Sequence, residues 1–116
     1  MRLLILFLLA TAPGWGQLED LGREYRELRK QTGHFSGGGT WNDAVDHWKG
    51  RKHEVMAELG RQLGQVRTDR LLQIMGPPDE RRANRWIYFW RGGHDYLYFE
   101  VEGARVTSSH WWMAGE

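Results

Sequence analysis

Apolar positions in the first two thirds of the chain recur with the spacing of helices. Between residues 18 and 31 they come every three or four positions among charged residues, which predicts an amphipathic helix: Leu18, Leu21, Tyr25 and Leu28. A second stripe predicts a helix from Thr40 to about Leu63: Trp41, Val45, Trp48, Val55, Leu59 and Leu63. Lys52 lies in this stripe and is expected to extend its ammonium to water. A third, short helix spans residues 68–75, because the following Gly76-Pro77-Pro78 cannot continue it.

After Pro78 the pattern changes to alternation, which is typical of strands. Residues 86–90, 95–101 and 105–113 are predicted strands, joined by glycine-containing turns at 91–94 and 102–103. Helices followed by an antiparallel meander define the α+β class. We therefore expect N-terminal helices packed on a three-stranded antiparallel sheet. One domain is expected, since 116 residues is an ordinary size for a single domain.

The alternation divides the predicted sheet into two faces. One is expected to be mostly aliphatic and to pack under the helices: Ile87, Phe89, Leu97, Phe99, Val101 and Val106. The other is expected to be aromatic, extended by Trp111 or Trp112: Trp86, Tyr88, Trp90, Tyr96 and Tyr98. Because Trp and Tyr dominate the energetics of interfaces, this aromatic face, with Trp111, is the candidate site for a protein or sugar partner. The alternative is that the first helix covers it.

The first 16 residues have the pattern of a secretory signal peptide. Arg2 supplies a positive charge, residues 3–10 are apolar, and Gly14 and Gly16 are small residues near the expected cleavage point. An apolar block of about 10 residues is too short for a bilayer, which needs about 20. We expect cleavage after Gly16 and export of residues 17–116, to the periplasm or the medium.

Charge and cysteine content exclude several classes of partner. The chain has 16 Lys and Arg against 15 Asp and Glu, and loss of residues 1–16 removes Arg2 and no acid. The mature domain would then have no formal net charge, so a nucleic-acid partner is not expected. Cysteine is absent, so neither disulfides nor a lipid anchor on an N-terminal cysteine are expected. We also expect no cofactor.

Two segments imitate binding motifs without completing them. The glycine-rich segment 33–39, followed by Thr40, has part of the spacing of a phosphate-binding loop but lacks its lysine and its preceding strand. It is interpreted as a flexible loop. His53-Glu54 begins like the helix of a zinc protease, yet Ala57 stands where the second histidine is needed, so no metal site is expected there.

Two sets of polar residues are candidates for a hydrolase site. Small secreted ribonucleases also place helices before an antiparallel sheet and use Glu, Arg and His, for which Glu100, Arg105 and His110 are the candidates. The neighbours Ser109 and His110 point to opposite faces of a strand, so adjacency does not aim that serine at the imidazole. The second set shares one face of the predicted second helix, where polar side chains usually face solvent: His47, Arg51, Glu54 and Glu58.

Residues 64–112 resemble a known family. The similarity lies in a short helix with a Gly-Pro stop and in the strand pattern that follows: residues 64–68, Leu71, Leu72, Ile74, residues 75–78, 86–88, 97–99, the Glu102-Gly103 turn and Val106. This pattern is similar to the SmpA/OmlA small outer-membrane protein domain, whose fold is shared with the β-lactamase-inhibitory-protein-like group. The resemblance implies helices over a three- or four-stranded antiparallel sheet. It also implies binding of another protein, as in outer-membrane β-barrel assembly or the capping of an enzyme.

Members that assist barrel assembly usually carry a lipid-bearing cysteine after the signal, which this chain lacks. The sequence thus predicts an exported, non-enzymatic protein-binding or envelope-accessory module that is not lipid-anchored and whose partner is another protein. The alternative is a small secreted hydrolase of the ribonuclease-like kind, using Glu100 and His110.

Overall fold

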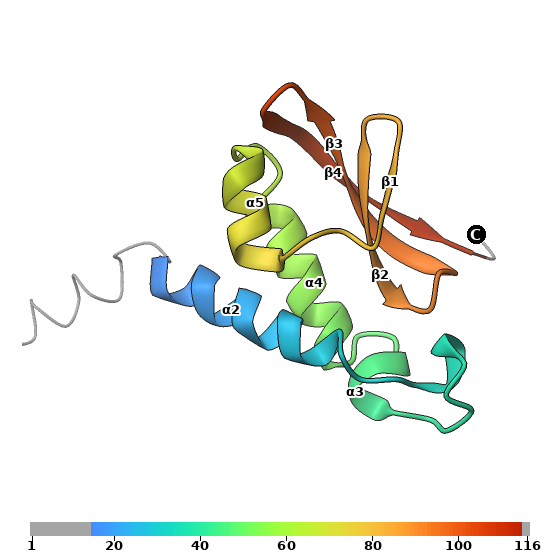
Figure 1. The fold of residues 1–116 in the computed structure, drawn as a ribbon. Helices are drawn as coiled ribbons and strands as arrows, with labels where there is room; N and C mark the ends of the chain where they lie inside the picture. Colours follow the sequence, from blue (N-terminus) through green and yellow to red (C-terminus); the bar gives the residue numbers. More distant parts are fainter. Residues whose placement is uncertain (1–14, 115–116) are drawn as a thin grey trace, which may run out of the picture.

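Helices lie on one side of a four-stranded antiparallel sheet in the computed structural model, which describes residues 15–114 (Figure 1). Most of the predicted signal peptide, residues 1–14, lies outside the described residues. The helices are α2 (Trp15–Leu28), the short 3-10 helix η1 (His34–Ser36), α3 (Asp43–Asp46), α4 (Arg51–Gln62) and α5 (Thr68–Met75). The strands are β1 (Glu80–Arg82), β2 (Arg85–Arg91), β3 (Asp95–Glu102) and β4 (Arg105–Met113), adjacent in the sheet in chain order.

The predicted α+β class is confirmed, but the sheet has four strands where three were expected. The additional strand, β1, is short and wholly charged, so no alternation of apolar residues marks it in the sequence. It forms because the chain reverses at Ala83, whose φ of 53° is left-handed, and lies back along β2. The amide of Asp79 extends the pairing by donating to the carbonyl of Ile87 at 2.8 Å.

Side chains of α2 cap the open end of α5. The last carbonyls of a helix have no partner within the helix. Here Arg26 donates to the carbonyl of Ile74, and Arg29 donates to the carbonyl of Met75 at 3.0 Å. The two helices approach closely at Gly22, where an added Cβ would lie 2.4 Å from the carbonyl oxygen of Ile74. A glycine in α2 and two arginines therefore fix the crossing of α2 and α5.

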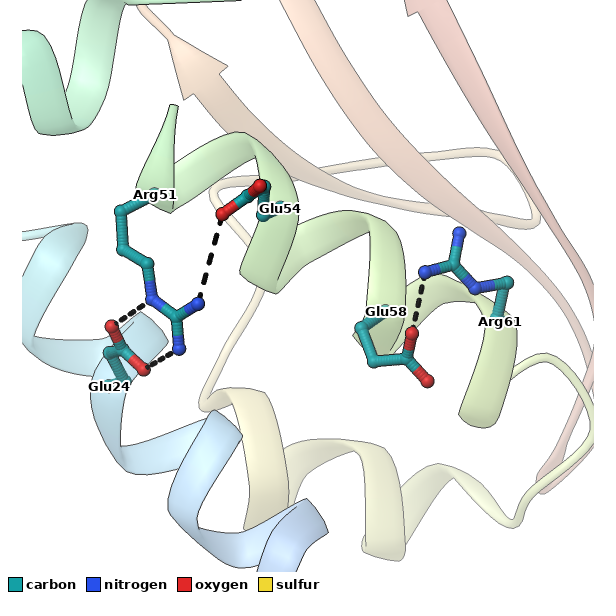
Figure 2. A network of polar contacts seen from close by, with 5 residues as sticks. All are labelled: Glu24, Arg51, Glu54, Glu58 and Arg61. Carbon is teal, nitrogen blue, oxygen red and sulfur yellow. Dashed lines mark hydrogen bonds and ion pairs between the residues drawn. The ribbon is translucent and has the colours of Figure 1, made fainter. Parts of the chain in front are cut away.

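An ion-pair network joins α2 to α4 on the outer surface of the helical layer (Figure 2). The guanidinium of Arg51 binds the carboxylate of Glu24 through two nitrogens, one of them 2.6 Å from Oε1, and its third nitrogen lies 3.8 Å from Glu54. The hydrogen bond from Arg51 lowers the pKa of Glu24. One turn further along α4, Glu58 accepts a hydrogen bond from Arg61. Exposed pairs of this kind contribute little, on the order of 0 to 1 kcal/mol each, so this face orients the two helices more than it stabilises them.

The predicted helix over residues 40–63 is interrupted. The chain forms the single turn α3 and then the longer α4, with a break at residues 47–50 where Lys49 has a φ of 65°. Gly50 allows the break, because an added Cβ would lie 2.7 Å from the carbonyl oxygen of Asp43. Trp41 lies before the first turn of α3 and Trp48 lies in the break, and they are 50% and 51% exposed, whereas Val45 of α3 stays buried. The expected single stripe of apolar residues therefore does not exist.

Lys52 lies on the inner face of α4 with Val55 and Met56, and the residue as a whole is only 5% exposed. The sequence predicts that its ammonium reaches water, and the ammonium is indeed not among the buried polar atoms without a partner in residues 15–114.

The segment that precedes α3 folds around the buried carboxylate of Asp46, although the sequence predicts a flexible loop over 33–39. Asp46 Oδ2 accepts hydrogen bonds from the backbone amides of His34 and Asn42, both at 2.8 Å, and Oδ1 accepts from Phe35 at 3.4 Å. Burial by itself would raise the pKa of Asp46, but these three hydrogen bonds outweigh it and hold the pKa below its ordinary value. Gly33 packs on the carboxylate, since an added Cβ would lie 2.5 Å from both oxygens.

We predict that Asp46→Asn lowers the free energy of unfolding by about 3 kcal/mol at neutral pH, because an amide cannot accept all the hydrogen bonds that a buried carboxylate accepts. Urea denaturation of purified protein measures this. The lowered pKa means that the stabilisation by Asp46 is present above its ordinary pKa of 3.8 and is lost as the pH falls through the value in the folded protein. The difference between variant and wild type should therefore shrink below pH 3.8.

The matched control is Asp69→Asn, which changes an exposed carboxylate in a 3.5 Å pair with Arg67. Equal losses in the two variants would show that Asp46 does not organise the loop.

Candidate functional site

The register between β2 and β3 divides the six predicted partner-binding residues between the two faces of the sheet. Trp86 pairs with Phe99 and Tyr88 pairs with Leu97. Directly opposed residues in an antiparallel pair share a face, so the even-numbered aromatics of β2 lie with Leu97 and Phe99. The expectation that Ile87 and Phe89 of β2 lie on the helical side is therefore wrong. The matching expectation for Leu97 and Phe99 of β3 is right.

Four of the six predicted residues face the helices: Trp86, Tyr88, Trp90 and Trp111. Tyr88 and Trp90 are fully buried, and the other two are partly buried against the same core. Their polar atoms have internal partners, because the Tyr88 hydroxyl donates to the carbonyl of Gly76 at 2.8 Å and the Trp90 indole donates to the carbonyl of Val45 at 2.7 Å. Tyr25 of α2 packs edge-on against Tyr88. For these four, the alternative of burial beneath the helices holds.

The other two, Tyr96 and Tyr98, lie on the face that no helix covers in Figure 1, which we call the open face. The register arranges its side chains in rows that cross three strands. The aromatic row is Phe89, Tyr96 and Trp112. The middle row is Ile87 and Tyr98, which His110 continues on β4. The polar row is Arg85, Glu100 and Ser108, and His110 is counted with it because its imidazole lies 3.0 Å from Ser108 Oγ. The face thus grades from aromatic at the end near Gly92 to charged at the end near Asn84.

Ring contacts hold the aromatic side of the open face. Tyr96 and Trp112 stack with their planes 24° apart and their centroids 6.5 Å apart. Tyr98 and His110 stack at 5.2 Å and 30°, and the guanidinium of Arg85 lies 4.5 Å from the ring centre of Tyr98. Trp112 is 55% exposed, whereas Tyr96 is buried beneath its neighbours. Alternation along the strand leaves open which of Trp111 and Trp112 faces outward, and the structure places Trp112 on the open face.

The polar row brings Glu100 and His110 together, as the hydrolase alternative requires. Ser108 Oγ donates to Glu100 Oε1 at 2.9 Å, and His110 Nε2 lies 3.0 Å from Ser108 Oγ and 3.4 Å from Glu100 Oε1. The pKa of Glu100 is lowered, first by the hydrogen bond from Ser108 and then by His110 and Arg85. Ser108 was missed because only the neighbour of His110 was considered. A spacing of two positions, which places strand residues on the same face, is the signal that would have found it.

This polar row is not arranged as a nucleophilic triad. In a triad the acid holds one nitrogen of the histidine while the other nitrogen faces the nucleophile. Here one nitrogen of His110 lies beside both groups, and the serine donates to the carboxylate. Arg105, the third ribonuclease candidate, lies apart and donates to the carbonyl of Gln65 at 2.7 Å.

The second hydrolase set is separated by the break between α3 and α4. His47 lies in the break, with Nδ1 2.6 Å from the carbonyl oxygen of Trp48, whereas Glu54 lies on α4 beside Arg51. His53 is enclosed by the rings of Trp48, Trp90 and Trp111, at 4.6 to 5.0 Å. Burial, followed by the charge of Arg91, lowers the pKa of His53. Within residues 15–114, no group of three or more His, Cys, Asp and Glu is placed to hold a metal ion.

A second exposed aromatic surface lies beside the glycine-rich segment, and we call it the loop rim: Phe35, Trp41 and Trp48. Phe35 is 38% exposed, and its ring contacts Trp41 at 6.1 Å. The guanidinium of Arg91 lies 4.8 Å from the Phe35 ring centre and 4.2 Å from that of Trp90. The loop rim is thus joined through Arg91 to the core beneath it.

The fold and its surfaces define a small α+β protein whose helices cover one face of an antiparallel meander and leave the other face open. No family model, curated protein or solved structure matches the chain. The resemblance of residues 64–112 to the SmpA/OmlA domain therefore stays a prediction. Across residues 15–114, no helix has the length and apolar character needed to cross a membrane.

Proposed function

We propose that this protein is an exported binding module that holds another protein against the open face and has no catalytic step of its own. The observation that carries the proposal is the exposed Trp112, stacked on Tyr96 within an ordered cross-strand row on the face away from the helices. Exposed tryptophan on a soluble surface is unusual enough to mark a contact site when it belongs to a cluster.

The composition of the open face suits a protein partner. Interfaces are enriched in Tyr, Trp and Arg, with polar groups at the rim. Here aromatic side chains occupy one end, and Arg85 with Glu100 supplies charges of both signs at the other. Because paired strands and ring stacking already fix these side chains, little conformational entropy remains to be lost on binding.

The open face is favoured over the loop rim because its side chains are already more firmly fixed. Of the rim aromatics, Trp41 lies just before α3 and Trp48 lies in the break between α3 and α4. About half of each side chain is exposed. The open-face rings lie on strands that are hydrogen-bonded on one or both sides. A rigid surface needs less ordering to bind a partner with the same contact area.

Export is the second part of the proposal, and it rests on the signal-like residues 1–16. We predict that N-terminal sequencing of the protein recovered from its native host gives Gln17 as the first residue, because the signal peptide is removed after Gly16. The protein should be found in the periplasm or the medium. Recovery of a cytoplasmic protein that still begins at Met1 would contradict export.

Site-specific photo-cross-linking tests the binding face. We predict that p-benzoyl-phenylalanine at position 112 cross-links the partner in living cells of the native host, because Trp112 is the most exposed aromatic side chain of the proposed contact. The same group at Arg23, an exposed position of α2 in the helical layer, should give no such product. Mass spectrometry of the cross-linked band identifies the partner.

Two further variants sharpen this experiment. Trp112→Ala should leave the unfolding transition nearly unchanged and reduce co-purification of the identified partner at least about tenfold, which is the loss expected of a hot-spot residue. Cross-linking from Trp41 but not from position 112 would move the contact to the loop rim. That result, or full retention of the partner by Trp112→Ala, would contradict binding through the open face.

A hydrolase remains the second candidate, because the polar row places Glu100, Ser108 and His110 within hydrogen-bonding distance of one another. If this row is catalytic, purified protein should cleave RNA or ester substrates, and His110→Ala should abolish the turnover through loss of the only imidazole in the row. His47→Ala is the matched control, since His47 lies in the break between α3 and α4. Turnover that survives His110→Ala, or none in the wild type, would exclude this candidate.

A further inference from the structure

A small, partly open cavity lies beside the end of β2. Its volume is about 120 Å³, and its lining comes from the turn after α2, from η1, α3 and α4, from Asp79 just before β1, and from the end of β2. Val45, Phe89 and Trp90 give it apolar walls, and Arg29, Lys52 and Asp79 give it charges. It lies just beyond the point where β1 stops pairing with β2, so no neighbouring strand fills this space.

Lys52 is the cation of this cavity that lacks a partner. The residue as a whole is 5% exposed, and its ammonium makes no hydrogen bond or ion pair with any other residue of the described range 15–114. The ammonium keeps some contact with solvent, because the buried polar side-chain atom without a partner in that range is the hydroxyl of Tyr25. An ammonium that is largely removed from water and has no ionic partner is destabilised, and a bound anion would offset that cost. Burial lowers the pKa of Lys52 to about 8, with Arg29 acting in the same direction.

Both acidic groups that act on Lys52 are already engaged. Asp79 binds the guanidinium of Arg29 at 3.1 Å and accepts a hydrogen bond from the amide of Phe89 at 2.8 Å. Asp46 accepts from three backbone amides of the glycine-rich segment and its neighbours. They raise the pKa of Lys52 only enough to offset part of the burial. At neutral pH the cavity therefore holds Arg29, Lys52 and one carboxylate, which leaves one positive charge without a counter-charge.

The remaining polar groups of the lining can donate to an anion. The side-chain oxygen of Gln31 accepts from Asn42 at 3.1 Å, and the Gln31 amide nitrogen makes no hydrogen bond with another residue in the part of the chain that the structure describes. Arg29 is held in place by the carbonyl of Met75 and by the rings of Tyr25 and Tyr88, at 5.1 and 5.6 Å from its guanidinium. A fixed guanidinium and a free ammonium are the groups that recognise carboxylates.

We propose that this cavity is a binding site for a small monocarboxylate whose negative charge pairs with Lys52 and whose short apolar part lies against Val45 and Trp90. One uncompensated charge suits a singly charged ligand better than a phosphate, and the volume suits a ligand of a few heavy atoms. This inference does not depend on the proposed partner of the open face.

Titration of ¹⁵N-labelled protein with sodium propionate tests the site. We expect saturable shifts of the backbone amides of Ser36 and Gly92, which line the cavity, with Trp112 unaffected. Propionamide has the same shape without the charge and should bind at least about tenfold more weakly, because a hydrogen bond to a charged group is lost. The affinity for propionate should fall as the pH rises past about 8, since Lys52 then loses its proton.

Lys52→Met should fold, because an apolar side chain of similar length replaces a largely buried lysine that has no ionic partner, and it should lose propionate binding. Lys30→Met is the matched control, since it removes an exposed lysine paired with Glu27 and should bind as the wild type does. Three results would each overturn the proposal: no saturation of the wild type, equal binding by Lys52→Met, or equal affinity for propionamide. Inorganic phosphate that binds as tightly as propionate would overturn the assignment to a carboxylate.

Discussion

The pairing of Tyr88 with Leu97 is the constraint on which the rest of this structure depends. Because side chains alternate along a strand, this one register decides which aromatic rings of β2 enter the core and which remain outside. It places Trp90 under the helices, where its indole reaches the carbonyl of Val45 and ties α3 to the sheet. It also places Phe89 in line with Tyr96 and Trp112 on the open face. A shift of this register by one residue would move the core rings of β2 to the open face and the outward ones into the core.

The helical layer is held to the sheet by a small number of polar contacts at its edges. The arginines of α2 satisfy the last carbonyls of α5, and the carboxylate of Asp46 gathers the amides of the segment before α3. Such contacts are specific in direction, because a buried donor or acceptor without a partner is costly. They fix where each helix ends and how it crosses its neighbour, whereas the apolar core beneath them supplies most of the stabilisation.

The two sites proposed here use opposite physical properties of the same fold. The open face is broad, aromatic and directed outward, with Trp112 available to a large partner. The cavity beside β2 is small and partly enclosed. Because its surroundings are less polar than water, the single charge of Lys52 attracts an anion more strongly there than it would in solution. Both arise at the margins of the core: one where no helix covers the sheet, the other where β1 ends before β2 does.

The sequence by itself determined the α+β class, the helix over Thr68–Met75 and the three longer strands, because strong periodicity and the Gly-Pro stop are local signals. It also named Glu100 and His110 among the polar candidates, and the sheet does bring these two together. Only the tertiary structure decided that Trp86, Tyr88 and Trp90 are core residues, since alternation defines two faces but not which of them meets the helices. The charged strand β1, the break before α4 and the burial of Lys52 depend on contacts between distant segments. No local pattern of residues encodes those contacts.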